Sequence, residues 1–311
     1  MNASGKTYLR KTTRAILLLL TAAFSWLSTH AHAQVFVAQT GGGVGKYDGT
    51  TGSAINTGFV SGGNPGGVAL SGNTLYVANT STNTVATYDA TTGTSLNPSF
   101  VTGLHDPTKL FVYAGFLYVV NNSSGTIGKY DASTGATINA SFMGGLAAPN
   151  GAVVASNNLL YVANTSVGVI SKYNLATGSV LSSNYIDAPN CWGLALANGD
   201  LLVSIFTSTG NVSEYDTGLG HLINANFITG LNDPTDIAVN GPNLLVENNG
   251  GTTVGEYKSS TGTAVNASFI SGLSSAPTGL AVGIPEPQSI ALLTLGLVGI
   301  MARRRPASPK A

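Results

Sequence analysis

Six oxygen-bearing side chains are the strongest candidates for chemistry in this sequence. They are Asp106, Asn150, Asn190, Asp233, Asp236 and Glu247. Carboxylate and amide oxygens are the ligands that Ca²⁺ prefers, so several of them converging on one point would form a calcium site. A calcium ion held there would support a metal-dependent enzyme. Whether these side chains meet depends on the elements that carry them.

Other side chains that carry chemistry are few. Trp192 is the only Trp after residue 33, and its indole could stack on a sugar ring, although we expect it to pack between repeats. His105 and His221 lie in non-equivalent turns, and we expect both to be exposed. The serine-hydrolase elbow, the zinc-protease helix motif and paired cysteines are absent. We therefore assign no catalytic residue, no metal ligand and no cofactor, and we keep Ca²⁺ for the enzyme alternative below.

Two aromatic ladders with one period reveal an internal repeat. The first, followed by Asp in four copies, consists of Tyr47, Tyr88, Tyr130, Tyr173, Tyr215 and Tyr257. The second runs in step and consists of Phe59, Phe100, Phe142, Tyr185, Phe227 and Phe269. Successive members of each ladder are 41, 42, 43, 42 and 42 residues apart. One supersecondary unit is therefore copied six times.

Each copy contains four short apolar runs separated by Gly, Asn and Asp turns, which predicts a four-stranded antiparallel sheet. Repeats of this length are typical of a β-propeller. Val35–Ala38 reads as a second strand without a first, and Gly279–Val282 as a first strand without a second. We predict an all-β, six-bladed β-propeller over residues 34–283, closed by pairing these two segments. The alternative, a β-solenoid or open repeat array, would not need complementary ends.

The ring separates some of the candidate oxygen ligands. Asp106 and Asp233 hold the same place in opposite blades, so they would surround a channel mouth more readily than grip one ion. Each also precedes a Pro, and Asp-Pro is a common turn dipeptide. The candidate residues for binding at the channel mouth are Asp106, Asn150, Asn190, Trp192, Asp233, Asp236 and Glu247.

Glu247 is the odd member of its own ladder. The matching residues of the other copies are Ala38, Ala78, Val120, Ala163 and Ser204. A buried carboxylate among such residues would have a raised pKa and mark a site. We favour the alternative, in which the strand ends there and Glu247 lies in the turn before Asn248.

The first 33 residues have the pattern of a secretory signal peptide. A basic start at Lys6 to Arg14 is followed by an apolar segment and by Ala31-His32-Ala33. We expect export by the Sec machinery and cleavage by signal peptidase between Ala33 and Gln34. Cys191 is the only cysteine, so the exported chain forms no internal disulfide.

The charge of residues 34–283 argues against a nucleic-acid partner. This segment has five lysines, no arginine and twelve Asp and Glu, which gives a formal charge of −7. Binding to nucleic acid needs clustered cations that neutralise phosphates, and the segment does not have them. The neutral charge of the whole chain comes from basic residues near its two ends.

Residues 284–311 form a separate tail. The tail contains Pro285, Glu286 and Pro287, then an apolar stretch, then Arg303, Arg304 and Arg305. The apolar stretch is shorter than the ~20 residues that a full membrane span needs. These features resemble the PEP-CTERM sorting tail, which implies a Gram-negative host, processing by exosortase and transient insertion of the tail in the inner membrane. The alternative is a plain C-terminal tail anchor.

The repeat also resembles a family. Residues Gly67 to Gly93, GVALSGNTLYVANTSTNTVATYDATTG, look like the NHL class and the related YVTN repeats of surface-layer proteins. The resemblance implies a propeller but no single function, because such folds serve as binding modules, lyases and lactonases.

These observations favour an exported, non-enzymatic protein of the cell surface or extracellular matrix that presents a propeller for binding. Extracellular polysaccharide or another envelope component is the expected ligand, by context. The alternative is a secreted propeller enzyme of lactonase or lyase type with its site at the channel mouth. Four or more oxygen ligands converging there would favour the enzyme.

Overall fold

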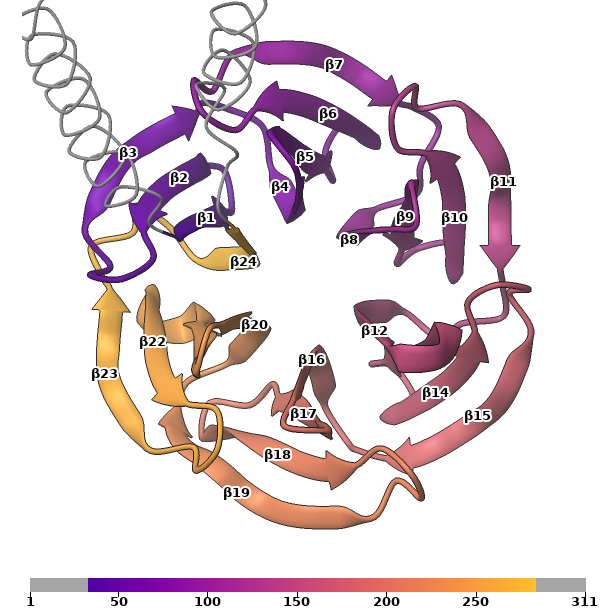
Figure 1. Cartoon of the computed structure of the whole chain (residues 1–311), viewed down its shortest axis with the longest axis vertical. Helices are drawn as coiled ribbons and strands as arrows, with labels where there is room; N and C mark the ends of the chain where they lie inside the picture. The colour runs from indigo at the N-terminus through magenta and orange to yellow at the C-terminus, as the bar shows by residue number, and fades with distance from the viewer. Residues whose placement is uncertain (1–32, 284–311) are drawn as a thin grey trace, which may run out of the picture. The chain divides into compact units, whose positions relative to one another are not determined.

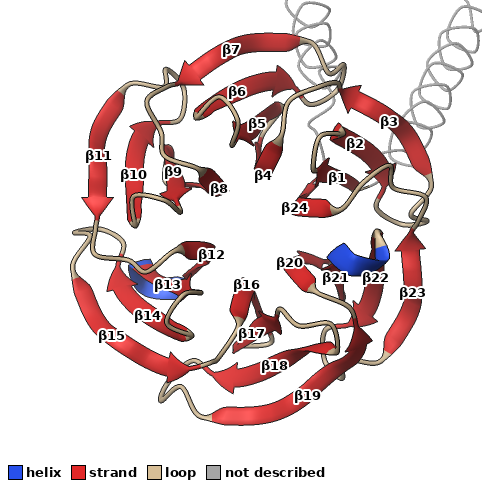
Figure 2. Ribbon diagram, turned by 180° about the vertical axis from the view of Figure 1, so that it is seen from behind, coloured by secondary structure: helices blue, strands red, loops and turns tan. Residues whose placement is uncertain are grey.

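Residues 33–283, which the computed structural model describes, form six four-stranded antiparallel sheets around a central channel (Figure 1). The sheets are the blades of a β-propeller, as the repeat predicted. We number them in chain order as β24-β1-β2-β3, β4–β7, β8–β11, β12–β15, β16–β19 and β20–β23. Within each blade the first strand in this order lies at the channel and the last at the rim (Figures 1 and 2).

Strands of equivalent position have similar lengths in all six blades. The innermost strands are β24 (Pro277–Gly283), β4 (Pro65–Ser71), β8 (Pro107–Tyr113), β12 (Pro149–Ala155), β16 (Cys191–Ala197) and β20 (Pro234–Asn240). The second strands are β1 (Gln34–Gln39), β5 (Thr74–Asn79), β9 (Phe116–Asn121), β13 (Leu159–Asn164), β17 (Asp200–Ile205) and β21 (Asn243–Asn248).

The third strands are β2 (Gly43–Asp48), β6 (Thr84–Asp89), β10 (Thr126–Asp131), β14 (Val169–Asn174), β18 (Gly210–Asp216) and β22 (Thr253–Lys258). The outer strands are β3 (Ala54–Val60), β7 (Ser95–Val101), β11 (Thr137–Met143), β15 (Val180–Asp187), β19 (Leu222–Leu231) and β23 (Ala264–Ile270). Single 3₁₀ turns, η1 (Ser156–Asn158) and η2 (Asn249–Gly251), follow β12 and β21.

The first blade is assembled from both ends of the described chain. Strand β1 pairs with β24 as predicted, and the register places Val35 opposite Val282 and Ala38 opposite Gly279. Strand β1 also pairs with β2 on its other side. The pairing leaves no free sheet edge between the first and last repeats, which removes a site of edge-to-edge aggregation.

The two aromatic ladders meet at the seams between blades. At each seam the second-ladder aromatic of one blade lies in the same apolar cluster as the first-ladder Tyr of the next, for example Phe100 with Tyr130 and Phe227 with Tyr257. Phe269 of the sixth blade meets Tyr47 of the first in the same way. The period of the sequence is therefore the period of inter-blade packing.

The Asp that follows the first-ladder Tyr shapes the turn between the third and outer strands. The Oδ1 atom of Asp131 accepts hydrogen bonds from the backbone N–H groups of Ser133 and Thr134, both at 2.9 Å, and from both hydroxyls. These bonds lower the pKa of the Asp131 carboxyl to about 2. Asn174 accepts from the same two backbone positions in the fourth blade. This carboxylate ladder is therefore turn chemistry.

The outer strands carry a second repeated device. In five blades an Asn side chain accepts a hydrogen bond from the backbone N–H two residues later, at Asn56, Asn97, Asn139, Asn224 and Asn266. The pairing register with the third strand shifts at the same place. Such bulges twist an exposed edge and blunt it against pairing with another chain.

Candidate ligand site at the channel mouth

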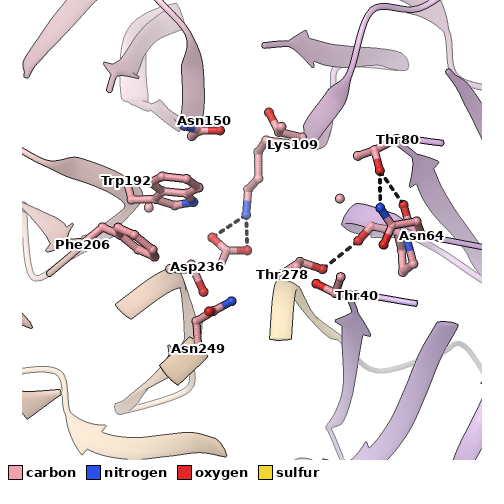
Figure 3. Close-up of a pocket in the computed structure, with 15 residues that line it drawn as sticks. Thr40, Asn64, Thr80, Lys109, Asn150, Trp192, Phe206, Asp236, Asn249 and Thr278 are labelled. Carbon is pink, nitrogen blue, oxygen red and sulfur yellow. Dashed lines mark hydrogen bonds and ion pairs between the residues drawn. The ribbon is translucent and has the colours of Figure 1, made fainter. Parts of the chain in front are cut away.

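A cavity of about 300 Å³ opens at the end of the channel where the innermost strands begin (Figure 3). All six blades contribute to its lining. Most of the lining residues lie at the start of the innermost strands, and the rest directly follow the ends of the second strands. Ligand pockets in proteins commonly start at this volume.

The third residue of the innermost strands sets the channel chemistry. It is Gly67, Gly151, Gly193 and Gly279 in four blades, and Lys109 and Asp236 in the third and sixth. A Cβ atom on Gly151 or Gly193 would lie well under 3.0 Å from a backbone oxygen of the next blade. Glycine is therefore needed where neighbouring innermost strands approach most closely. The two blades that depart from this rule are opposite each other.

Lys109 and Asp236 form an ion pair across the channel. The Lys109 Nζ atom lies 2.7 and 2.5 Å from the two Asp236 carboxylate oxygens. Figure 3 shows the lysine extending across the cavity to meet the carboxylate. The Asp236 oxygens also accept hydrogen bonds from the backbone N–H groups of Ile237 (3.0 Å) and Leu280 (2.9 Å). A carboxylate has about four acceptor positions, and all four are occupied here.

Glu247 lies inside the sheet, so the prediction that it lies in a turn is wrong. Its residue is 0% exposed, and strand β21 continues through it, with Glu247 opposite Val254 of β22. The chain accommodates it because the β20–β21 register shifts, leaving Thr235 and Asp236 outside the regular pairing. Glu247 Oε2 accepts the Asp236 backbone N–H at 3.2 Å and the Thr235 hydroxyl at 2.9 Å.

Burial, and then the charge of Asp236, raise the pKa of Glu247 to about 8. The Glu247 carboxyl is therefore neutral at pH 7. Ser204 holds the equivalent position in the fifth blade and does the same structural task, since its Oγ accepts the Gly193 N–H at 2.7 Å. Both side chains serve a backbone N–H that the shifted strand leaves without a ladder partner.

An aromatic pair forms one wall of the cavity. We expected Trp192 to pack between repeats, but its ring lies in the cavity lining and stacks on Phe206, which follows β17 of the same blade (Figure 3). The ring centroids are 4.6 Å apart and the planes make an angle of 28°. Sequence analysis missed Phe206 because it lies outside both aromatic ladders.

Of the other predicted residues, Asn150 lines the cavity, and its amide is held by two neighbours. Its Oδ1 accepts a hydrogen bond from Asn122, and its Nδ2 donates to Thr165, both at 3.0 Å. Of the six candidate oxygen ligands, Asn150 and Asp236 line the cavity, whereas Asp106, Asn190, Asp233 and Glu247 lie outside its lining. Within residues 33–283 no group of three or more His, Cys, Asp or Glu is placed to hold a metal ion.

Asp106, Asn190 and Asp233 share a conformational explanation. Each directly precedes an innermost strand and has a positive φ, of 55°, 60° and 50°. Ala148 has a φ of 47° at the same place in the fourth blade. Asn and Asp tolerate this left-handed conformation better than most residues, so their types here follow from the turn. His105 and His221 are both exposed.

Side chains around the mouth tie the blades together. Hydroxyl or amide groups bond a backbone carbonyl near the start of the next innermost strand at five of the six seams, as Thr278 does to Pro65 at 2.7 Å and Asn249 to Pro277 at 2.9 Å. The others are Thr108 to Pro149, Thr165 to Cys191 and Ser204 to Thr235. The cavity therefore has a fixed rim, which favours a preformed site.

Comparison with known families identifies the end of the chain. Residues 283–305 match the family profile described as the PEP-CTERM protein-sorting motif. The chain carries a PEP-CTERM sorting motif. This motif indicates export with a membrane-associated C-terminal tail and sorting to the cell surface. Its residues, Pro285 to Pro287 and Arg303 to Arg305, and the predicted cleavage site after Ala33 within the signal region 1–33, fall largely outside the described residues.

Residues 19–141 match the profile of the outer membrane protein assembly factor BamB. The match is consistent with a propeller and does not assign the repeat to the NHL class. No curated protein sequence matches this chain with significance. In the part of the chain that the structure describes, no helix has the length and apolar character to cross a membrane.

A solved structure shares the fold of this chain at low sequence identity. A chain from the crystal structure of a nidogen/laminin complex is similar with a TM-score of 0.68 and 15% identity, covering 82% of this chain and 100% of that one. Two computationally designed proteins, Ika8 and Ika4, have TM-scores of 0.49 and 0.40 at 17% and 18% identity. Ika8 covers 78% of this chain and 73% of its own, and Ika4 covers 50% and 92%. At this identity the likeness concerns the fold alone.

Proposed function

We propose that this PEP-CTERM protein is a non-enzymatic binding module of the cell surface or extracellular matrix, and that its ligand binds in the cavity at the channel mouth. In this proposal the Sec machinery exports the chain, signal peptidase cleaves it after Ala33, and exosortase processes the tail while it is transiently inserted in the inner membrane. An extracellular polysaccharide or another envelope component is the ligand class. In this proposal the propeller belongs to the NHL-like class, which its repeat motif resembles.

The observation that carries the binding role is the Trp192–Phe206 stack in the cavity wall. An exposed aromatic face beside polar groups, inside a preformed concavity, is a common arrangement for holding a small ligand or one unit of a polymer. The rim hydrogen bonds hold this arrangement without a ligand. Binding would therefore require little ordering of the protein.

The enzyme alternative depends on the same cavity. A propeller lactonase or lyase would need a bound Ca²⁺ with several free oxygen ligands. Asn150 and Asp236 are in the lining, but N–H groups already occupy the Asp236 oxygens. We therefore prefer the binding module.

Glycan-array and calorimetric binding by the processed protein test the proposal. Trp192→Ala should weaken binding at least about tenfold, because loss of a buried aromatic contact costs on the order of 1.4 kcal/mol or more. Leu96→Ala on the outer strand is the matched control and should leave binding unchanged. Calcium-dependent hydrolysis of lactones that chelation abolishes would instead establish the enzyme.

Sorting is tested separately. Alanine substitution of Pro285–Pro287 and Arg303–Arg305 should change the location of the protein while its far-UV circular dichroism stays the same. Unchanged delivery of that variant would contradict exosortase sorting.

A further inference from the structure

The groups in the cavity wall define the charge of a ligand that fits it. Among the described residues of the lining, Lys109 is the only cation and Asp236 the only carboxylate. They are paired with each other, with side chains 15% and 7% exposed. The cavity therefore presents two opposite charges that cancel at contact distance, and no charge is left to attract an ionic ligand.

We infer that the cavity binds an uncharged saccharide unit, and that the Lys109–Asp236 pair makes it discriminate against acidic sugars. This inference rests on the proposed function and names its ligand class. Three features support it, namely the groups left free in the wall, the aromatic stack, and the electrostatic cost of adding a second anion.

The polar groups left free in the wall match hydroxyl groups. Two of the three Lys109 ammonium donors are used by Asp236, and no described residue accepts the third. The Asn249 Nδ2 group donates to Pro277, while its Oδ1 receives no hydrogen bond from the described chain. The indole N–H of Trp192 has no acceptor in residues 33–283. Hydroxyl groups both donate and accept, so a sugar satisfies these scattered single donors and acceptors.

The aromatic stack matches the other surface of a sugar. A pyranose ring presents an apolar face of C–H groups and a rim of hydroxyls. Trp192 and Phe206 both line the cavity and stack on each other, so apolar ring surface lies on one side of the cavity (Figure 3). Lys109, Asn249 and Asp236 lie toward the centre of the same cavity. An apolar face and a polar rim therefore face the cavity together.

A sugar carboxylate would be poorly accommodated. It would approach the Lys109 ammonium while Asp236 is already 2.5 Å from it, so two carboxylates would compete for one cation in a partly desolvated site. Removing the charge of Asp236 alone would reverse this, because an unpaired ammonium in the cavity attracts anions. The ion pair therefore acts as a charge filter.

The experiment compares the processed wild-type protein with Asp236→Asn on an array of neutral oligosaccharides and matched oligosaccharides whose terminal residue is a uronate. The wild-type protein should prefer the neutral set by at least about tenfold. The Asp236→Asn variant should shift this ratio toward the uronates by about tenfold or more. Asp106→Asn removes the same charge from a residue outside the cavity lining and should leave the ratio unchanged.

A second variant guards against loss of folding in the first. Lys109→Gln keeps Asp236 and should lower uronate binding further, and thermal unfolding identifies any variant that does not fold. A wild-type preference for uronates, or no shift in either folded variant, overturns the charge filter while binding itself stands. If neither variant folds, the neutral-to-uronate ratio of the wild-type protein alone decides whether the charge filter stands. Absence of binding to both sets overturns the proposed function and this inference with it.

Discussion

In five outer strands an Asn side chain accepts the same backbone hydrogen bond, and all six outer strands present a half-exposed aliphatic residue, at Ile55, Leu96, Ile138, Leu181, Ile223 and Val265. At the channel mouth the blades differ from one another. The third residue of the innermost strand is Gly in four blades, Lys109 in the third and Asp236 in the sixth. The repeat is thus kept where blades only need to build a sheet and lost where they face a shared space.

Residues that could recognise a ligand lie where the blades differ from one another. Residues that every blade repeats have a local structural reason, such as a bulge, a turn or a seam. Residues that only one or two blades carry, such as Lys109, Trp192, Asp236 and Glu247, lie in the cavity wall or directly behind it. Departures from the repeat therefore mark the candidate site.

The largest effect is expected from adding a side chain at the channel. Gly193→Ala places a methyl group against the backbone oxygen of Thr235 in the next blade, so backbone atoms rather than a flexible side chain must shift. We expect a loss of about 3 kcal/mol or more in the free energy of unfolding, measured in urea. Leu96→Ala at the rim should cost less than about 0.5 kcal/mol. Equal costs at the two sites would remove the distinction between rim and channel.

Breaking the ion pair should have the next largest effect. Lys109→Met leaves the mostly buried Asp236 carboxylate without its cation, and we expect a loss of about 2–3 kcal/mol in stability by chemical denaturation. The double variant Lys109→Met/Asp236→Leu should recover most of that loss, because it removes both charges. Lys258→Met, which removes an exposed lysine at the outer turn, is the control and should change little. A double variant no better than the single one would show that the pair is not coupled.

Much of the architecture was predictable from the sequence. The ladders are seams, and seams repeat because each blade packs on the next with the same pair of aromatics. The complementary ends specified closure, since Val35–Ala38 and Gly279–Val282 pair in one sheet. Both features follow from the period of the repeat, so they can be recognised in the sequence without knowing which residues are in contact.

The site was predictable only in part. Comparing the third residue of each innermost strand, counted from its opening Pro or Cys, would have singled out Lys109 and Asp236, because the matching residues are glycines. The Ala, Val and Ser at the positions equivalent to Glu247 indicated a buried position, which we interpreted as a turn. The Trp192–Phe206 stack could not be predicted, since it depends on the direction of one side chain in β16 and of another that follows β17.

The pH dependence of stability tests the buried carboxyl behind the cavity. Folded Glu247 keeps its proton up to a pKa of about 8, whereas a Glu in an unfolded chain loses it near 4.3. Between these values the folded state binds more protons, so the free energy of unfolding should fall as pH rises from about 4.5 to 8 and then level off. Urea unfolding from pH 5 to 9 measures this slope. Glu247→Gln should flatten it.

The matched control for that slope is Glu214→Gln. Burial also raises the pKa of Glu214, but that side chain is partly exposed on the third strand of the fifth blade. Its substitution should leave most of the slope in place. A Glu247→Gln variant with the wild-type slope would contradict the assignment.

The smallest effect is expected at a rim turn. Asp131→Ala removes the hydrogen bonds to Ser133 and Thr134 and should lower the melting temperature slightly at pH 7. Because the folded pKa of Asp131 is lowered to about 2, its contribution is present above the unfolded value near 3.8 and disappears as pH falls toward 2. Asp131→Asn should lose less than Asp131→Ala, as Asn174 makes the same turn in the fourth blade. Melting curves at pH 7 and pH 2 check both statements.

The pairing of β1 with β24 means that the first blade can be completed only late in synthesis. Residues 34–39 are made before every other strand of the propeller but cannot complete their sheet until residues 277–283 have been made. The sorting motif begins at residue 283, immediately where this pairing ends. A polypeptide that ends before residue 277 therefore lacks both the strand that completes the first blade and the sorting motif.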